Sequence, residues 1–159
     1  MKKYKNHTIT VAPFLSEVEV TYKTKVKASD RVKVTTPKDA SDYARQAWGE
    51  GSIEYREEMM LILLNTNKQI LGWAKIGVGG LSTVVCDPKV IFSIALAANA
   101  SSIILVHNHP SGSENPSHQD MQLTRTVEAG GNFLDIKLLD HLILTADTYY
   151  SFGDNGFIK

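Results

Sequence analysis

The segment Ser102–Val106, which reads SIILV, constrains the fold of this chain more than any other feature. It is short, apolar and rich in β-branched residues, as is typical of a strand buried on both faces. Asp87 and Pro88 lie upstream as an N-cap and a first helical residue, so they predict a helix over Lys89–Ala100. Because strands buried on both faces are usually covered by helices, these segments predict an α/β protein.

Apolar periodicity and turn residues predict the remaining elements. Met59–Leu64 is a continuous apolar run, and Ile70–Gly77 follows it across a polar turn, which predicts an antiparallel hairpin. One helix is predicted to begin at Pro37 and to end at Gly49 and Gly51, and another to begin at Ser117 and to end at Gly130-Gly131. Further strands are predicted over 81–85, 134–145 and 149–152. Helices that alternate with strands, together with a hairpin, predict a three-layer α/β/α sandwich with a mixed sheet.

The N-terminal part of the chain differs in charge from the rest. The formal net charge is zero, with 17 Lys+Arg against 17 Asp+Glu, but residues 1–36 carry eight basic and three acidic residues. We therefore predict a basic N-terminal extension over residues 1–34, with an edge strand at Val18–Lys23 and a linker at Lys23–Lys33, and a folded domain over residues 35–159. The extension is either a solvated leader or a surface for an acidic partner.

Composition excludes several classes of protein. The chain has 159 residues and one cysteine, Cys86, so it forms no internal disulfide, and we expect Cys86 to be a small buried hydrophobe. No apolar stretch reaches the roughly 18 residues that a membrane span requires. The first residues lack the apolar core of a signal peptide, so the expected location is the cytoplasm.

Two histidines follow the predicted buried strand directly. His107 and His109 are two residues apart in extended chain, so both imidazoles point to the same side and can reach one metal ion. Asp120 lies in the first turn of the next helix, where the chain returns toward the end of the strand. Two histidines and one carboxylate leave a fourth position open, which is typical of a catalytic zinc.

Hydrolysis by a metal-bound water needs a nearby carboxylate as general base. Glu57 is the best candidate, because it precedes the first apolar strand and shares its side-chain parity with Met59. Glu54 and Glu58 are alternatives, and parity places Glu58 on the opposite face.

Each of these residues also has a purely structural interpretation. An H-x-H pair can be a hydrogen-bonded pair at a strand end, and Ser117 with Asp120 resembles a capping box. The two interpretations can coexist, since Ser117 can cap the helix while its hydroxyl lines the site. We interpret His7 as a surface residue of the tail, His118 as an exposed helical residue and His141 as a satisfied structural histidine.

The candidate residues together have the spacing of a known motif. A glutamate, H-x-H-P, a serine eight residues after the second histidine and an aspartate three residues later resemble the JAMM signature of the JAB/MPN metalloprotease superfamily. HNHPSG (107–112), LLDHLIL (138–144) and YYSF (149–152) are more narrowly similar to the RadC family. The resemblance covers residues 35–157.

The resemblance implies a cytidine-deaminase-like fold that holds a single zinc ion per chain on His107, His109 and Asp120. Glu57 would be the catalytic acid/base, and Ser117 would help to polarise the scissile carbonyl of a peptide or isopeptide bond. Deaminase chemistry requires H-x-E and P-C-x-x-C, and neither is present.

The chain departs from the superfamily at several points. Asn108 stands where many JAMM deubiquitinases have Ser or Thr, and the chain is too short for the insertions that hold ubiquitin. Longer RadC proteins carry a helix-hairpin-helix region where this chain has its basic leader. Three hypotheses follow: a zinc metallopeptidase acting on a peptide or protein, a DNA-associated protein or metal-dependent nuclease, and a catalytically silent scaffold.

Overall fold

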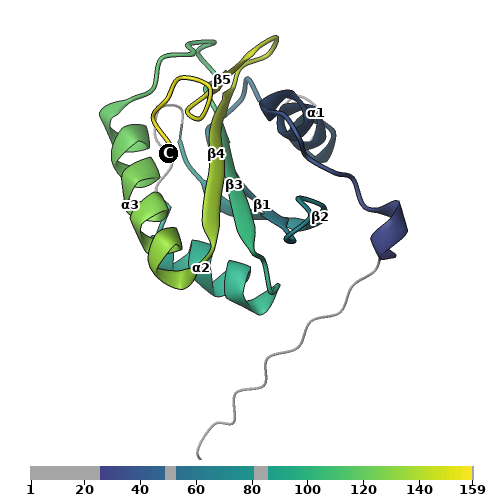
Figure 1. The fold of residues 1–159 in the computed structure, drawn as a ribbon. Coiled ribbons are helices and arrows are strands. Elements are labelled where there is room, and N and C mark those ends of the chain that lie inside the picture. The colour runs from purple at the N-terminus through teal and green to yellow at the C-terminus, as the bar shows by residue number, and fades with distance from the viewer. Residues whose placement is uncertain (1–25, 49–52, 81–85, 159) are drawn as a thin grey trace, which may run out of the picture.

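The computed structural model describes residues 26–48, 53–80 and 86–158. Five strands form one sheet, and three α-helices pack on it (Figure 1). The helices are α1 (Pro37–Ala47), α2 (Pro88–Ala97) and α3 (His118–Leu134), preceded by a short 3-10 turn, η1 (Ala28–Asp30). The strands are β1 (Glu58–Leu64), β2 (Ile70–Val78), β3 (Ser102–Asn108), β4 (Lys137–Leu144) and β5 (Tyr149–Ser151).

The sheet is mixed, with strand order β2-β1-β3-β4-β5. β1 is antiparallel to both β2 and β3, β3 is parallel to β4, and β4 is antiparallel to β5. The predicted hairpin is therefore confirmed as β1–β2. Only the β3–β4 connection is a parallel crossover, and α3 provides it, so the end of β3 and the start of α3 lie on the same side of the molecule.

Helix α1 covers one face of the sheet, and α2 and α3 cover the other (Figure 1). Alternate strand residues face the two sides, which gives two apolar cores. The α1 side buries Met60, Ile62, Leu64, Ile104, Val106, Leu142 and Leu144. The α2/α3 side buries Leu61, Leu63, Ile103, Leu105 and Leu138. The predicted three-layer α/β/α sandwich is confirmed.

β3 is the central strand, and all seven of its residues are buried. The strand predicted over Ser102–Val106 is two residues longer than expected, because it continues through His107 and Asn108. The ladder continues because β1 and β4 pair with β3 up to this point, as in the pairs Met59↔His107 and Asn108↔Leu144. The first histidine is thus part of the sheet rather than of a loop.

The predicted end of α3 at Gly130-Gly131 is wrong. The helix continues to Leu134 and ends where Asp135 adopts a left-handed conformation, with φ 57°. A Cβ atom on Gly131 would lie 2.3 Å from the carbonyl oxygen of Ile136, so this glycine permits close packing of helix and chain rather than ending the helix. β4 accordingly begins at Lys137 and not at Leu134.

The helix starts are confirmed. Asp87 caps α2 by accepting a hydrogen bond from the backbone N–H of Lys89, and α1 begins with a capping box between Thr36 and Asp39. α2 ends at Ala97, three residues before the predicted end. The glycines predicted to end α1 lie outside the described residues.

The described part of the predicted linker contacts the sheet. The backbone N–H of Val34 donates to Lys68 O and that of Ile70 donates to Val32 O, and the Val34 side chain is buried. Val32 and Lys33, at the end of the predicted linker, are therefore paired with residues at the start of β2, and Val34 follows directly after them. The strands predicted at 18–23 and 81–85, and His7, lie outside the described residues. No helix in the described ranges is long and apolar enough to cross a membrane.

Candidate metal centre

His107, His109 and Asp120 converge at the carboxyl end of β3. His107 Nε2 lies 3.1 Å from His109 Nε2 and 3.2 Å from Asp120 Oδ1, and His109 Nε2 lies 3.7 Å from Asp120 Oδ2. His107 is 1% exposed, whereas His109 and Asp120 are 12% and 13% exposed. The structure thus brings the three predicted ligands together, and the group could bind a metal ion.

The spacing of these atoms fits a tetrahedral cation. With bonds of about 2.0–2.1 Å, neighbouring ligand atoms of a tetrahedral zinc lie roughly 3.3 Å apart. The distances from His107 Nε2 to His109 Nε2 and to Asp120 Oδ1, 3.1 and 3.2 Å, are close to that value, and one ligand atom from each of the three residues lies within 4.8 Å of the others. The group contains three candidate ligands among the described residues, so a tetrahedral cation bound to them would keep a fourth position for water, as a catalytic site requires.

The capping box of α3 holds Asp120 in place. Asp120 Oδ2 accepts a hydrogen bond from the backbone N–H of Ser117 at 2.7 Å, and Ser117 Oγ accepts one from the backbone N–H of Asp120 at 3.2 Å. Asp120 Oδ1 is left to face His107. The structural and the metal-binding interpretations of Asp120 therefore hold together, and the exposed Ser117 lies one turn from it.

The charges of the group favour a cation. Burial alone would raise the pKa of Asp120, but hydrogen bonds with His107 and His109, which these rings donate through Nε2 when they are protonated, hold it well below its ordinary value. The hydrogen bond with Asp120 raises the pKa of His109. Asp120 is therefore an anion, and without a metal it attracts a proton to the histidine beside it.

A backbone carbonyl orients His109. Its Nδ1 lies 2.7 Å from Ser113 O, and a carbonyl oxygen only accepts, so Nδ1 carries the proton that is donated. The neutral ring then presents a bare Nε2 to His107 and Asp120. This is the tautomer that a metal ligand bound through Nε2 must have.

His141 is buried and contacts His107 from β4. Both of its ring nitrogens have partners, His107 Nδ1 at 2.9 Å and Thr124 Oγ1 at 2.7 Å, so it is a satisfied histidine as predicted. Burial and repulsion from His107 lower its pKa well below the ordinary value, so the ring is neutral. Sequence reasoning missed its contact with a ligand; the only signal was a histidine within the apolar run LLDHLIL.

Glu57 lies just before β1, on the side of the metal centre. β1 and β3 pair as Met59↔His107, so extending this antiparallel register by two residues places Glu57 opposite His109. Its backbone is held by hydrogen bonds with Gly79 and Gly80, and its carboxylate contributes to the raised pKa of His109. Of the three glutamates considered, Glu57 is the one that acts electrostatically on a candidate ligand in this way.

The other two glutamates are placed differently. Glu58 is 1% exposed and pairs with Arg56 at 2.9 Å and Lys75 at 2.7 Å. Burial would raise its pKa, but these two cations lower it, so Glu58 is a charged structural group. Glu54 is exposed in the turn before β1.

Asn108 was missed as a functional residue. Its side chain is fully buried on the face opposite the metal centre, where Oδ1 accepts from the backbone N–H of Glu58 at 2.7 Å. Its Nδ2 donates to Ile53 O at 2.6 Å and to Arg56 O at 2.8 Å. The residue between the two histidines therefore holds the segment that carries Glu57, and no local pattern indicates contacts about 50 residues away.

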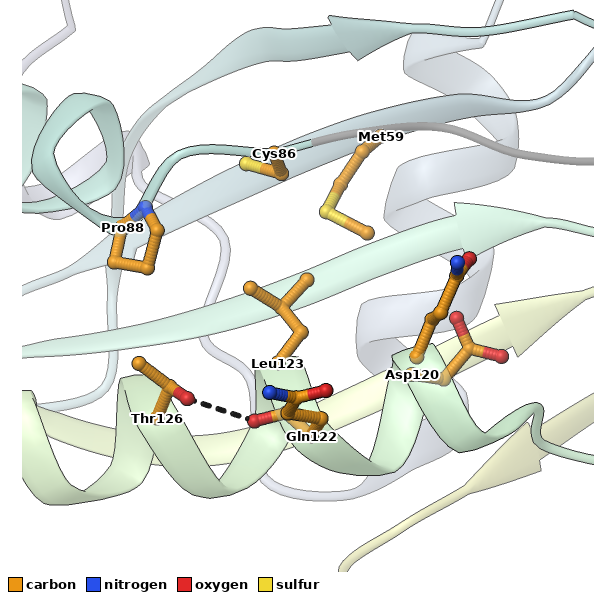
Figure 2. A pocket seen from close by; sticks show the side chains of 8 residues that line it. Met59, Cys86, Pro88, Asp120, Gln122, Leu123 and Thr126 are labelled. Carbon is orange, nitrogen blue, oxygen red and sulfur yellow. Dashed lines mark hydrogen bonds between the residues drawn. The ribbon is translucent and has the colours of Figure 1, made fainter.

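A cavity of about 370 Å³ opens beside Asp120 (Figure 2). It lies between α3, β1 and the start of α2, with Asp120 at one end and Pro88 and Thr126 at the other. Its lining consists of Met59, Cys86, Pro88, Gln119, Asp120, Gln122, Leu123 and Thr126. The volume lies in the range of small-molecule and side-chain pockets, and apart from Asp120 the lining is neutral.

Cys86 and His118 fit their structural interpretations. Cys86 is half-buried in this cavity, and burial, with a smaller effect of Asp87, raises the pKa of its thiol to about 11. Such a thiol is a poor nucleophile at neutral pH. His118 is exposed at the first residue of α3, as predicted.

Comparison with known proteins gives a consistent result. Residues 34–157 match the family model described as RadC-like JAB domain. A UPF0758 protein of Flavobacterium johnsoniae is 39% identical over 124 residues, covering 78% of this chain and 53% of that protein. A UPF0758 protein of Clostridium beijerinckii is 34% identical over 144 residues, covering 91% and 62%. The chain thus spans about half the length of such relatives, or slightly more.

Proposed function

This chain belongs to the RadC-like JAB-domain family, and we propose that it is a zinc-dependent hydrolase that cleaves a peptide or isopeptide bond with a metal-activated water. One observation carries the proposal. His107, His109 and Asp120 each offer one electron-pair donor, these donors lie within 4.8 Å of one another, and the group contains no fourth ligand among the described residues. Two imidazole nitrogens and one carboxylate are the donors that a catalytic zinc takes.

His107, His109 and Asp120 would hold a divalent cation, which would supply Lewis-acid activation of a water molecule and of a carbonyl group. Glu57, which directly precedes β1 and contributes to the raised pKa of His109, would accept the proton of the attacking water and return it to the leaving amine. The Ser117 hydroxyl accepts from the backbone N–H of Asp120, so its own proton is free to be donated to the developing oxyanion.

The surroundings of the centre favour an amide over a phosphodiester. The cavity beside Asp120 is lined, among the described residues, by apolar and neutral polar side chains and by no Lys or Arg. Glu57 and Asp120 add negative charge on the side where substrate must approach. Desolvating a phosphate there is costly without a cationic partner, whereas a peptide with an apolar side chain meets no such cost.

Cleavage of a peptide library by the Zn²⁺-loaded protein, followed by mass spectrometry, tests this function. The library includes peptides linked through a lysine side chain, and a DNA duplex is incubated in parallel. We expect peptide cleavage that falls roughly 10²–10⁴-fold in Glu57→Gln, the usual range for loss of a general base. Glu54→Gln is the matched control, because Glu54 is exposed in the turn before β1. We expect this variant to retain wild-type activity.

Three results would contradict the proposal. Cleavage of DNA without cleavage of any peptide would replace the peptidase with a nuclease. A protein that binds zinc and cleaves neither substrate, or a Glu57→Gln variant as active as the wild type, would favour the silent scaffold.

A further inference from the structure

A chain of hydrogen bonds leads from His107 into the interior, away from the other ligands. His107 Nδ1 lies 2.9 Å from His141 Nε2, and His141 Nδ1 lies 2.7 Å from Thr124 Oγ1. Thr124 Oγ1 lies 2.6 Å from the backbone carbonyl oxygen of Asp120. These hydrogen bonds thus start at one candidate ligand, His107, and end at the backbone of another, Asp120. His107, Thr124 and His141 are each at most 1% exposed, so water does not replace these bonds.

The donor and the acceptor of each of these hydrogen bonds follow from the last group in the series, the carbonyl oxygen of Asp120. A carbonyl oxygen only accepts, so the single hydroxyl proton of Thr124 is donated to Asp120 O. Thr124 Oγ1 must therefore accept from His141, and the proton of the neutral His141 ring is on Nδ1. His141 Nε2 is then a bare acceptor, which requires His107 to carry its proton on Nδ1.

We propose that His141 and Thr124 are positioning residues that hold His107 as the Nδ1–H tautomer, with the lone pair of Nε2 directed at the metal. The proposal rests on the metal site of the proposed function, but it concerns metal affinity rather than hydrolysis. A metal ligand commonly donates its second N–H to a carboxylate or carbonyl, and here a neutral histidine takes that place.

Packing fixes the orientation of His141. It lies on β4 opposite Leu105, so it is the diagonal neighbour of His107 on the same face of the sheet. Its ring stacks on the fully buried Phe152, with centroids 4.8 Å apart and planes 11° apart. The His141 ring therefore has little freedom to turn, and its hydrogen bond restricts the rotation of the His107 ring as well. We call the hydrogen bonds that run from His107 through His141 and Thr124 to Asp120 O the relay.

Nuclear magnetic resonance of the metal-free wild type tests the tautomers directly. Long-range ¹H–¹⁵N correlation of the histidine rings distinguishes a protonated from a bare ring nitrogen. In mildly alkaline buffer we expect His107 and His141 both to carry their proton on Nδ1. A bare Nδ1 on His107 would overturn the proposal, even if every variant below fails to fold.

Zinc affinity, measured by competition with a chromophoric chelator, tests the consequence. We expect His141→Phe, which keeps a ring beside Phe152 but removes the acceptor, to weaken Zn²⁺ binding about 10–100-fold. His141→Gln restores affinity to within a few-fold of wild type, because the amide oxygen can accept from His107 Nδ1. Thr124→Val weakens binding by less, since the acceptor on His141 remains.

Thr126→Val is the matched control for Thr124→Val. Thr126 Oγ1 also donates to a carbonyl four residues earlier, that of Gln122, but it touches no candidate ligand. Its substitution leaves zinc affinity unchanged. A folded His141→Phe that binds Zn²⁺ like the wild type, or equal losses in the two threonine variants, would overturn the proposal.

These outcomes are separable from the proposed activity. A chain that shows the expected tautomers and affinities but cleaves no peptide overturns the hydrolase and supports the relay. A peptidase whose zinc affinity is unchanged in folded His141→Phe overturns the relay alone. A wild type that binds no Zn²⁺ overturns both.

Discussion

Asn108 Oδ1 accepts the backbone N–H of Glu58 at 2.7 Å, so the residue between the two candidate histidine ligands is bonded to the residue after the candidate base. The same side chain donates to the carbonyls of Ile53 and Arg56. Alternation along β3 explains this division: His107 points to the α3 side, and Asn108 points to the α1 side. One strand end thereby sets both the ligands and the position of Glu57.

We predict that Asn108→Ala lowers the free energy of unfolding by roughly 2–4 kcal/mol, because one buried N–H group and two partly buried carbonyl groups of the backbone lose their partner. Asn108→Asp is no better, since a carboxylate accepts from Glu58 but cannot donate to the two carbonyls. Urea denaturation measures both changes. In the folded fraction, activity falls more than zinc affinity does, because Glu57 shifts while the ligands remain. Wild-type stability in either variant would contradict this role.

A second prediction concerns the two glycines inside α3. Gly131→Ala places a Cβ 2.3 Å from the carbonyl oxygen of Ile136, a backbone atom, and we expect a loss of about 1–3 kcal/mol in the free energy of unfolding. Gly130→Ala meets only the ring of Phe92, at 2.7 Å, which can turn away. Its cost is partly offset by the roughly 1 kcal/mol that alanine gains in a helix. Equal changes in thermal or urea unfolding would show that close packing does not explain these glycines.

Cys86 is predicted to be unreactive. With a thiol pKa raised to about 11 by burial, roughly one thiol in a thousand is ionised at pH 8. We expect the folded chain to react with a disulfide reagent at least about 100-fold more slowly than the chain unfolded in guanidinium. The rate rises with pH until the thiol titrates. Since Cys86 is the single cysteine, reagent absorbance reports it alone. Equal rates in folded and unfolded chains would contradict the burial of this thiol.

Metal binding is predicted to depend on pH. The hydrogen bond with Asp120 raises the pKa of His109, so in the metal-free chain a proton stays on His109 above its ordinary pKa. A cation must displace that proton, so zinc affinity increases as pH rises through the raised pKa and levels off above it. Titration calorimetry in buffers of different ionisation enthalpy measures the proton released. Binding without proton release near neutral pH would contradict the account.

Much of the fold follows from local patterns. The continuous apolar run of β3, the hairpin and the caps at Asp87 and Ser117 are each encoded within a few neighbouring residues. The convergence of the three candidate ligands follows in the same way, because an H-x-H pair at a strand end and an aspartate in the first turn of the next helix need only parity and topology to come together. The backbone of β1 likewise identifies the face on which Glu57 lies.

The features that were missed depend on contacts that form only when the chain is folded. Gly131 has the propensity of a helix terminator, but its contact with Ile136 after the turn decides its role. Asn108 and His141 are polar residues within buried strands, which indicates that each needs partners without saying which. Their partners, the segment before β1 and His107 on β3, come close only when the sheet is assembled.

Metal content per chain, measured by mass spectrometry on tag-free protein, tests the central claim most directly. We predict about one zinc per chain in the wild type, lost in His109→Ala and retained in His118→Ala, whose histidine is exposed on α3. Absence of metal from the wild type after incubation with Zn²⁺, or equal metal in the two variants, would contradict the account.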